Sequence, residues 1–333
     1  MRRASVTLAA AFAAAGLFAG RASAHVGLIA PAATSYLARV SSAPRGVEAK
    51  VVDGDQRLWL RVPPGTSVVV LGVRDEPYLR FSAAGVEVNT RSETYYLNRV
   101  RPLTPPPGIG PRTPPVWTRL TAARSGSWHE GRLHTPALAS HPSGSSYDGR
   151  WLVPVVVNGR RTAIAGGLWQ AARPSLLWFW PLALVLACIP ALLRVRDAGW
   201  DASATAVLAG VALLAATAGR LGRELYGRPT VSSWQLALAG ASLAVAVALA
   251  ALFLRRDWRA LAAVAIGIVA VYEGLALAGT LRNGFVLAAL PAWAERTAAV
   301  TSLAAGAALL VVVVVAPSGT VARTSRAGPV VSR

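Results

Sequence analysis

The sequence predicts an exported all-β, sandwich-like domain followed by an α-helical membrane domain. Three features support this fold class: a basic start and an apolar run ahead of a small-residue cleavage site, a stretch of short strand patterns separated by turn residues, and a series of long apolar runs. We therefore divide the 333 residues into a signal peptide (1–24), an exported β-domain (25–173), a transmembrane domain of five spans (174–317) and a cytoplasmic tail (318–333).

The first part has the plan of a secretory signal peptide. Two arginines follow Met1, an apolar run extends from residue 4 to residue 19, and small residues stand at Ala22-Ser23-Ala24, where the peptidase would read them. Cleavage after Ala24 would leave His25 as the first residue of the exported chain. Its free α-amine and its imidazole could together chelate a metal ion.

Short strands are expected in the exported domain. Two hairpins are the clearest: residues 47–51 and 58–62 flank Asp53-Gly54-Asp55, and residues 151–157 and 161–169 flank Asn158-Gly159. We expect further strands at 67–73, 77–81, 85–89 and 117–120, and loops at 101–115, which holds seven prolines, and at 125–149, which is rich in Gly, Ser, Pro and His. This series of short strands favours a β-sandwich.

Five apolar runs are long enough to span a membrane, and they lie at Leu176–Leu193, Ala202–Ala218, Trp234–Leu254, Ala260–Leu281 and Thr297–Ala316. Phe285–Trp293 is also apolar, but it is too short to cross about 30 Å of hydrocarbon and contains Pro291. We expect it to be an interfacial or re-entrant segment.

The arginines favour an orientation with the β-domain outside the cell and the C-terminus in the cytoplasm. In this orientation eight arginines lie inside, against five in the outer segments (Arg220, Arg223, Arg228, Arg282 and Arg296). The signal peptide predicts the same orientation. We therefore expect a multi-pass protein of the plasma membrane.

Charge and cysteine content restrict the partners. The net charge of +19 comes almost wholly from arginine, because Lys50 is the only lysine, and residues 25–175 hold 18 Lys and Arg against 9 Asp and Glu. A basic domain outside the cell would meet anionic lipid headgroups or envelope polymers rather than nucleic acid. Cys188 is the only cysteine and falls in the first apolar run, so the exported domain has no disulfide.

All four histidines lie in the exported domain, and they suggest a metal site. His129 and His134 stand five residues apart around Gly131, so both could reach one ion if the segment bends there. With His25 they would form a nitrogen-rich site of the kind that Cu(II) prefers, whereas Cu(I) would call for sulfur ligands that the exported domain lacks. The alternative is that these are ordinary surface histidines.

Glu273 is the notable residue of the membrane domain. It stands near the middle of the fourth predicted span, where an ionised carboxylate is costly unless it is paired or faces water. We expect its partner to be Arg220 or Arg223, at the end of the second span. A purely structural ion pair, or a protonated glutamate, would explain the residue equally well.

Two resemblances bear on function. The start Ala24-His25 ahead of a β-rich domain resembles the periplasmic copper-binding CopC proteins, which implies that His25 binds copper. The segments Glu76–Arg80, Gly85–Asn89, Tyr96–Arg99 and Trp128–His134 are similar to motifs in a group of multi-pass membrane proteins from high-GC bacteria that have no established activity. This second resemblance implies the same two-part architecture.

These observations favour a non-enzymatic membrane protein whose exported domain binds or senses a metal ion, Cu(II) by preference, in envelope metal handling. No phosphate-binding glycine loop, nucleophile elbow or His-Glu-x-x-His helix occurs in the sequence. Two alternatives remain open: an envelope interaction protein that binds anionic lipid or polymer, and a small transporter that uses Glu273. A metal-binding protein and an envelope interaction protein would both be expected to have partner proteins, for metal handling or for envelope assembly.

Overall fold

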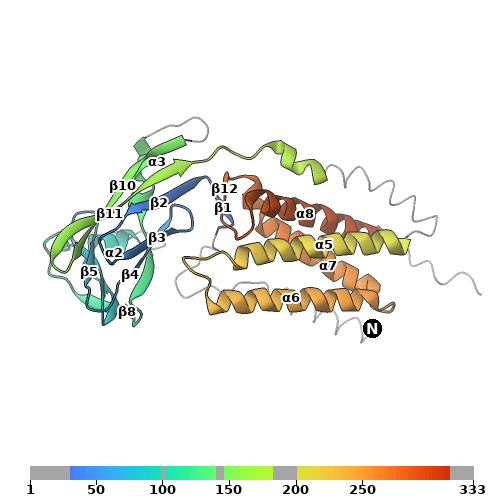
Figure 1. Cartoon of the computed structure of the whole chain (residues 1–333), viewed down its shortest axis with the longest axis horizontal. Helices are drawn as coiled ribbons and strands as arrows, with labels where there is room; N and C mark the ends of the chain where they lie inside the picture. Colours follow the sequence, from blue (N-terminus) through green and yellow to red (C-terminus); the bar gives the residue numbers. More distant parts are fainter. Residues whose placement is uncertain (1–30, 99–102, 140–145, 183–200, 316–333) are drawn as a thin grey trace, which may run out of the picture.

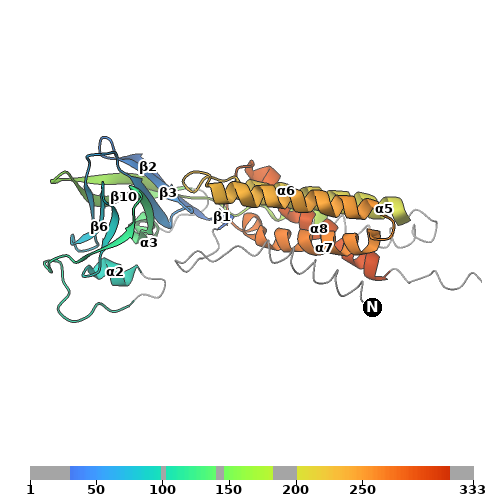
Figure 2. The same cartoon turned by 90° about the horizontal axis from the view of Figure 1, so that it is seen from below.

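The computed structural model describes residues 31–98, 103–139, 146–182 and 201–315, and it consists of a β-rich domain and a bundle of long helices (Figure 1). The β-rich domain lies at one end of the bundle in both views (Figure 2). The predicted combination of a β-domain and a helical membrane region is therefore confirmed. The predicted signal peptide, His25 and the cytoplasmic tail lie outside the described residues.

Two antiparallel sheets form the β-domain. The larger has the strand order β2-β11-β10-β5-β6-β7-β8, and the smaller has the order β3-β4-β9. The strands are β2 (Tyr36–Ser42), β3 (Glu48–Val52), β4 (Arg57–Arg61), β5 (Val68–Leu71), β6 (Pro77–Ser82), β7 (Gly85–Asn89), β8 (Trp117–Thr121), β9 (Ser125–His129), β10 (Ser146–Val157) and β11 (Arg160–Gln170). Three short helical segments accompany them: α2 (Glu93–Leu97), η1 (Gly131–Leu133) and α3 (Thr135–Ala139).

The two sheets share one hydrophobic core, which gives the domain its sandwich character. Leu58, Leu60 and Trp128 of the small sheet pack in the same cluster as Phe81 and Ile164 of the large sheet. Alternation along each strand turns these apolar side chains inward. The predicted turn at Asn158-Gly159 joins β10 to β11, and both residues adopt the positive φ angles (47° and 81°) that a tight hairpin turn requires.

Two predicted loops contain structure that the sequence did not reveal. Segment 125–149 was expected to be a loop, but β9 pairs with β4 along its whole length, with Trp128 opposite Leu58. Its sequence Ser-Gly-Ser-Trp-His has a single apolar side chain, so tertiary pairing rather than propensity forms the strand. Strand β2 was also missed, and it pairs with β11 at one edge of the large sheet.

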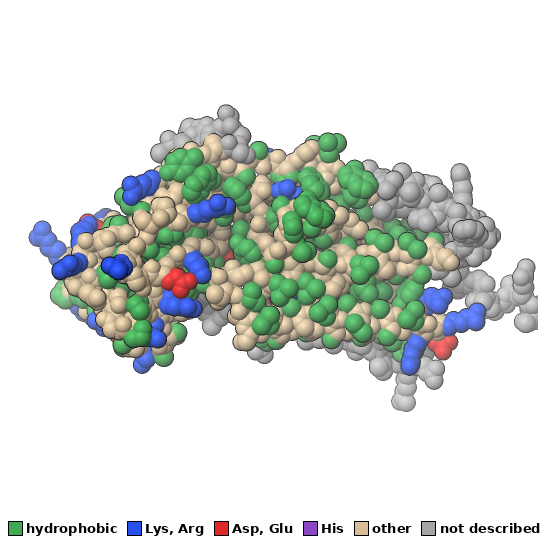
Figure 3. Space-filling model, in the orientation of Figure 1, with side chains coloured by type: hydrophobic (Ala, Val, Ile, Leu, Met, Phe, Trp, Pro, Cys, Tyr) green, Lys and Arg blue, Asp and Glu red, His purple; other side chains and the backbone are tan. Residues whose placement is uncertain are grey.

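The bundle contains four helices that are long and apolar enough to cross a membrane, among the residues that the structure describes. They are α5 (Asp201–Glu224), α6 (Ser233–Leu254), α7 (Arg259–Ala276) and α8 (Ala292–Val315). Hydrophobic side chains spread over the visible face of the bundle (Figure 3). Four of the five predicted spans correspond to these helices. Most of the first one, Leu176–Leu193, lies outside the described residues, which include only its start at η2 (Leu176–Phe179).

The segment before α8 contains structure that the sequence did not reveal. Within Phe285–Trp293, whose interfacial or re-entrant position stays a prediction, β12 (Phe285–Val286) pairs with β1 (Ala33–Thr34), and α8 begins at Ala292. The predicted span Ala260–Leu281 is also divided, because α7 ends at Ala276 and η3 (Ala278–Leu281) follows. The β1–β12 pair connects the start of the β-domain with the helical bundle (Figure 1).

Candidate functional site at the domain junction

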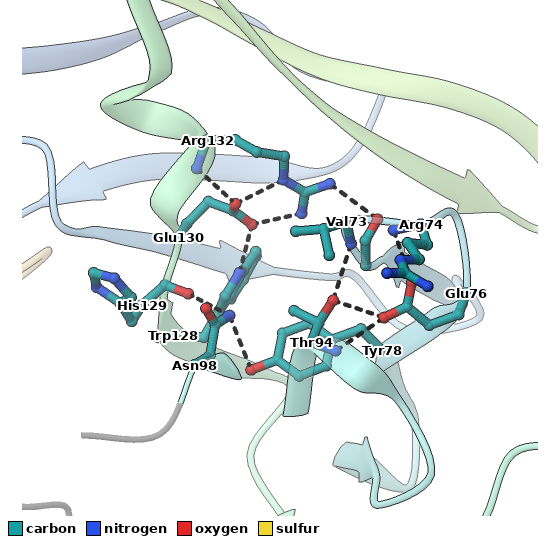
Figure 4. A network of polar contacts seen from close by, with 11 residues as sticks. Val73, Arg74, Glu76, Tyr78, Thr94, Asn98, Trp128, His129, Glu130 and Arg132 are labelled. Atoms are coloured by element: carbon teal, nitrogen blue, oxygen red, sulfur yellow. Dashed lines mark hydrogen bonds and ion pairs between the residues drawn. The ribbon is translucent and has the colours of Figure 1, made fainter. Parts of the chain in front are cut away.

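Residues of three of the four motifs in the β-domain lie together in a network of polar contacts (Figure 4). The Glu130 carboxylate accepts hydrogen bonds from Trp128 Nε1 (3.0 Å) and from Arg132 Nε and Nη2 (both 2.7 Å). Arg132 Nη1 donates to the carbonyl oxygen of Gly72 (3.4 Å), directly after strand β5 of the large sheet. This network joins the two sheets, and its polar groups form hydrogen bonds with one another. We therefore assign it a role in folding rather than in ligand binding.

Glu76 is the centre of a second buried group. Its carboxylate accepts hydrogen bonds from the hydroxyls of Ser92 (2.9 Å) and Thr94 (2.7 Å), and from the amides of Thr94 and Arg74 (both 3.0 Å). Burial raises the pKa of Glu76, but the hydrogen bonds from Thr94 and Ser92 outweigh burial, so that the pKa lies below its ordinary value. Glu76 is therefore an ionised structural carboxylate.

His129 stands apart from His134. Its ring is exposed and points away from the network in Figure 4, while its carbonyl oxygen accepts a hydrogen bond from Asn98 Nδ2 (3.0 Å). Since Trp128 points into the core, the alternation of β9 turns His129 to the outer face of the small sheet. Among the described residues, no group of three or more His, Cys, Asp or Glu side chains is placed to hold a metal ion.

His134 instead pairs with a carboxylate. Its Nδ1 contacts Asp55 Oδ2, and its ring packs edge-on against Tyr36 with 4.7 Å between ring centroids. An ionised carboxylate can only accept, so the proton of a neutral His134 lies on Nδ1 and Nε2 carries a lone pair. The His134 side chain is 38% exposed, so this lone pair lies on a side chain that solvent can reach.

The turn that carries Asp55 also contacts the helical bundle. Asp53 Oδ1 forms an ion pair with Arg228 Nη1 (3.3 Å), from the connection between α5 and α6, and Arg228 Nη2 donates to the carbonyl oxygen of Pro31 (3.1 Å). Asp53 adopts a positive φ of 59°, which a tight turn demands. A single turn, Asp53-Gly54-Asp55, therefore contacts His134 on one side and the membrane domain on the other.

A second set of contacts strengthens this junction. Ser35 Oγ donates to Asn283 Oδ1 (2.9 Å), next to the β1–β12 pair. Arg296 on α8 donates to the carbonyl oxygens of Thr280 and Gly284 (both 2.9 Å), which fixes the segment between α7 and α8. The two domains are thus joined through hydrogen bonds at several points.

The predicted partners of Glu273 are confirmed in position. Glu273 on α7 is buried (1% exposed) and lies 3.3 Å from Arg220 Nη1 and 3.5 Å from Arg223 Nη2, both on α5. Arg220 also pairs with Glu224 (3.2 Å), one turn along the same helix. The sequence did not single out Glu295, a fully buried acid at the start of α8, because an acidic residue in the first turn of a helix is common.

Comparison of the chain with protein-family models, with curated proteins and with solved structures gave no match. The functional reading therefore depends on the geometry of the chain itself.

Proposed function

We propose that this chain is an integral membrane protein of the cell envelope whose β-domain binds or senses a metal ion, Cu(II) by preference, with His134 as one ligand. The observation that carries the proposal is the pairing of His134 Nδ1 with Asp55. Metal-binding histidines usually donate their second ring N–H to a carboxylate or a carbonyl, which orients the ring and makes the metal-facing nitrogen more basic.

His25 is the second ligand in this proposal. It stands six positions before Pro31, and six residue steps of extended chain span at most about 20 Å. The chain passes beside the turn soon after residue 31: the amide of Ala38 donates to the carbonyl oxygen of Gly54 (3.0 Å), and Tyr36 packs on His134. An N-terminal amine and imidazole at His25, with His134 Nε2, would supply three nitrogen donors.

Sensing requires that occupancy of the site reaches the membrane domain. The same turn bears Asp55, which orients His134, and Asp53, which pairs with Arg228 of the α5–α6 connection. A ligand that moves or rigidifies this turn would therefore change contacts on the membrane side as well. We propose that the turn is the element through which the β-domain and the helices are coupled.

Copper titration of the full chain, produced with His25 as its first residue, tests the proposal. We expect tight Cu(II) binding and an EPR spectrum with nitrogen coupling, which disappears when one residue is added before His25 and in His134→Gln. His129→Gln is the matched control, because its ring lies on the outer face of β9, and it should keep the spectrum. Binding that is indifferent to His134 and to the added residue would refute the proposal.

The alternative, binding of anionic lipid or polymer, is favoured by basic side chains on the β-domain. Figure 3 shows basic side chains distributed over the visible face of that domain. Two of the basic residues lie over the ring of Trp59: the charged group of Lys50 is 5.7 Å from the ring centroid, and that of Arg61 is 5.1 Å from it. Such a domain would lose its ligand as salt rises and would not respond to a chelator. The response of β-domain stability to salt and to chelator thus separates the two functions.

A further inference from the structure

Charged side chains, three of them buried and two half-buried, form a cluster on α5, α7 and α8, near the ends of these helices that face the β-domain in Figure 1. It contains two guanidinium groups and three carboxyl groups, contributed by three helices: Arg220, Arg223 and Glu224 on α5, Glu273 on α7 and Glu295 on α8. If every group were ionised, the cluster would carry one uncompensated negative charge in a medium of low dielectric constant.

Glu295 is the member without a direct counter-ion. It is fully buried (0% exposed), and neither carboxyl oxygen accepts a hydrogen bond from any residue that the structure describes. Its Oε2 lies against the backbone of α5 at Gly222, where a Cβ atom would come within 2.3 Å of it. The carboxyl group is therefore held in a tight contact, and it makes no hydrogen bond or ion pair with the residues that the structure describes.

Complete burial, rather than the balance of the surrounding charges, opposes ionisation of Glu295. Two charged groups on neighbouring helices act on it: Arg223 on α5 attracts a negative charge, and Glu273 on α7 repels one. Arg223 is already shared by Glu273 (3.5 Å) and Glu224 (3.8 Å). The segment 287–291 is entirely apolar, and the guanidinium of Arg296 is engaged with backbone carbonyls.

We propose that Glu295 is a protonated carboxylic acid at neutral pH, and that Glu273 and Glu295 together form a proton-binding site at the domain-facing end of the helical bundle. A buried carboxyl group without a partner takes up a proton rather than remain charged. The positive end of α8 favours a negative charge on its first turn, but this effect is weak compared with complete burial. Proton-coupled transport or gating would need a second carboxyl group near Glu273, and Glu295 supplies it.

Infrared spectroscopy of the full chain in lipid bilayers tests this assignment directly. A protonated carboxylic acid has a carbonyl stretch that is separate from the bands of ionised carboxylates and shifts in D₂O. We expect this band at pH 7 in the unaltered chain, its loss in Glu295→Gln, and its retention in Glu48→Gln, which removes an exposed carboxylate paired with Lys50. Raising the pH should abolish the band in the unaltered chain.

Two further measurements distinguish loss of the acid at residue 295 from misfolding of the variant. Glu295→Gln replaces one neutral group by another of the same shape, so its helix content should match that of the unaltered chain. Glu295→Asp retains an acid and should shift the band instead of removing it. Absence of the band at pH 7, its persistence in Glu295→Gln, or its appearance only when choline replaces sodium would overturn the proposal, the last by showing that a metal cation occupies the site.

Discussion

At the scale of the residue, the β-domain depends on the buried carboxylates of Glu76 and Glu130, whose oxygens all accept hydrogen bonds. Glu76 accepts four hydrogen bonds from Ser92, Thr94 and Arg74, and Gly72 leaves room for it, since a Cβ there would lie 2.2 Å from Glu76 Oε1. Hydrogen bonds to charged groups contribute about 1.5–3 kcal/mol each, and loss of a partner in the interior is costly. The acidic residue of the motif Glu76–Arg80 thus has a structural role, because it stabilises the folded β-domain.

Replacement of Glu76 by Gln should destabilise the β-domain by about 2 kcal/mol, because the amide cannot accept every bond that the carboxylate accepts. Hydrogen exchange of the β5 and β6 amides in the full chain measures this opening free energy. Because the pKa of Glu76 is lowered in the folded state, its stabilisation is complete above the ordinary carboxyl pKa and is lost as the pH falls through the lowered value.

Glu87→Gln is the matched control for this change. Glu87 pairs with Arg80 (2.7 Å) at a partly exposed position, where a pair is worth about 0–1 kcal/mol. If Glu76→Gln were no less stable than Glu87→Gln, or if its stability fell with pH as in the unaltered chain, the structural role given to Glu76 would be wrong.

At the scale of the element, glycines bring α7 and α8 into close contact. A Cβ at Gly274 would lie 2.6 Å from Leu303 Cγ and 3.0 Å from the carbonyl oxygen of Ala299, and one at Gly306 would lie 2.9 Å from Ala270 Cβ. Small residues at such crossings allow backbones to approach, which is a main source of helix association in membranes. The α7–α8 pair is therefore the centre of the bundle.

Gly274→Ala should destabilise the helical bundle by about 1–3 kcal/mol, because the added methyl group overpacks the crossing. Gly240→Ala on α6 should have no such effect, since no atom lies within 4 Å of the added Cβ. Loss of helical circular dichroism on titration with SDS compares the two variants. Equal stability of both would contradict the close α7–α8 packing.

The sequence predicted the elements that have a strong local pattern of apolar residues, and it missed those that do not. The hairpins at 47–62 and 151–169 and the helices α5 to α8 carry strong periodic or apolar signals, and they were found. Strands β9 and β12 were missed because their formation depends on distant partners: Trp128 pairs with Leu58, and Val286 pairs with Ala33. The partners of Glu273 were predicted because a buried charge in a membrane span needs a counter-ion.

The junction site could be predicted only in part. The sequence singled out His134, but the contact with Asp55 is separated by 79 residues, and the ion pair of Asp53 with Arg228 by 175 residues. No local pattern shows that these three elements meet. The spacing of His129 and His134 meant that both could reach one ion only if the segment bends at Gly131, and the strand geometry of β9 turns His129 to the outer face.

At the scale of the whole molecule, the β-domain lies at one end of the helical bundle (Figures 1 and 2), and it contacts the bundle at the β1–β12 pair and at the α5–α6 connection. The predicted outer arginines lie at this end, for example Arg228 against Asp53 and Arg296 beside Gly284. This arrangement puts the β-domain and the segments that join α5 to α6 and α7 to α8 at the same end of the bundle, and the orientation of this end outside the cell stays a prediction. It also places the turn at residues 53–55 in contact with His134 and with Arg228, as the proposed coupling between the two domains requires.

The most direct test of this account is hydrogen exchange in residues 226–232, measured on the full chain starting at His25, with and without Cu(II). We expect Cu(II) to change exchange in this connection, and we expect Asp53→Asn to keep copper binding but to lose the change, because it weakens the ion pair with Arg228. Arg161→Gln, which breaks an exposed pair with Asp75, is the control and should leave the response intact. Absence of copper binding, or binding that leaves exchange at 226–232 unchanged, would contradict the account.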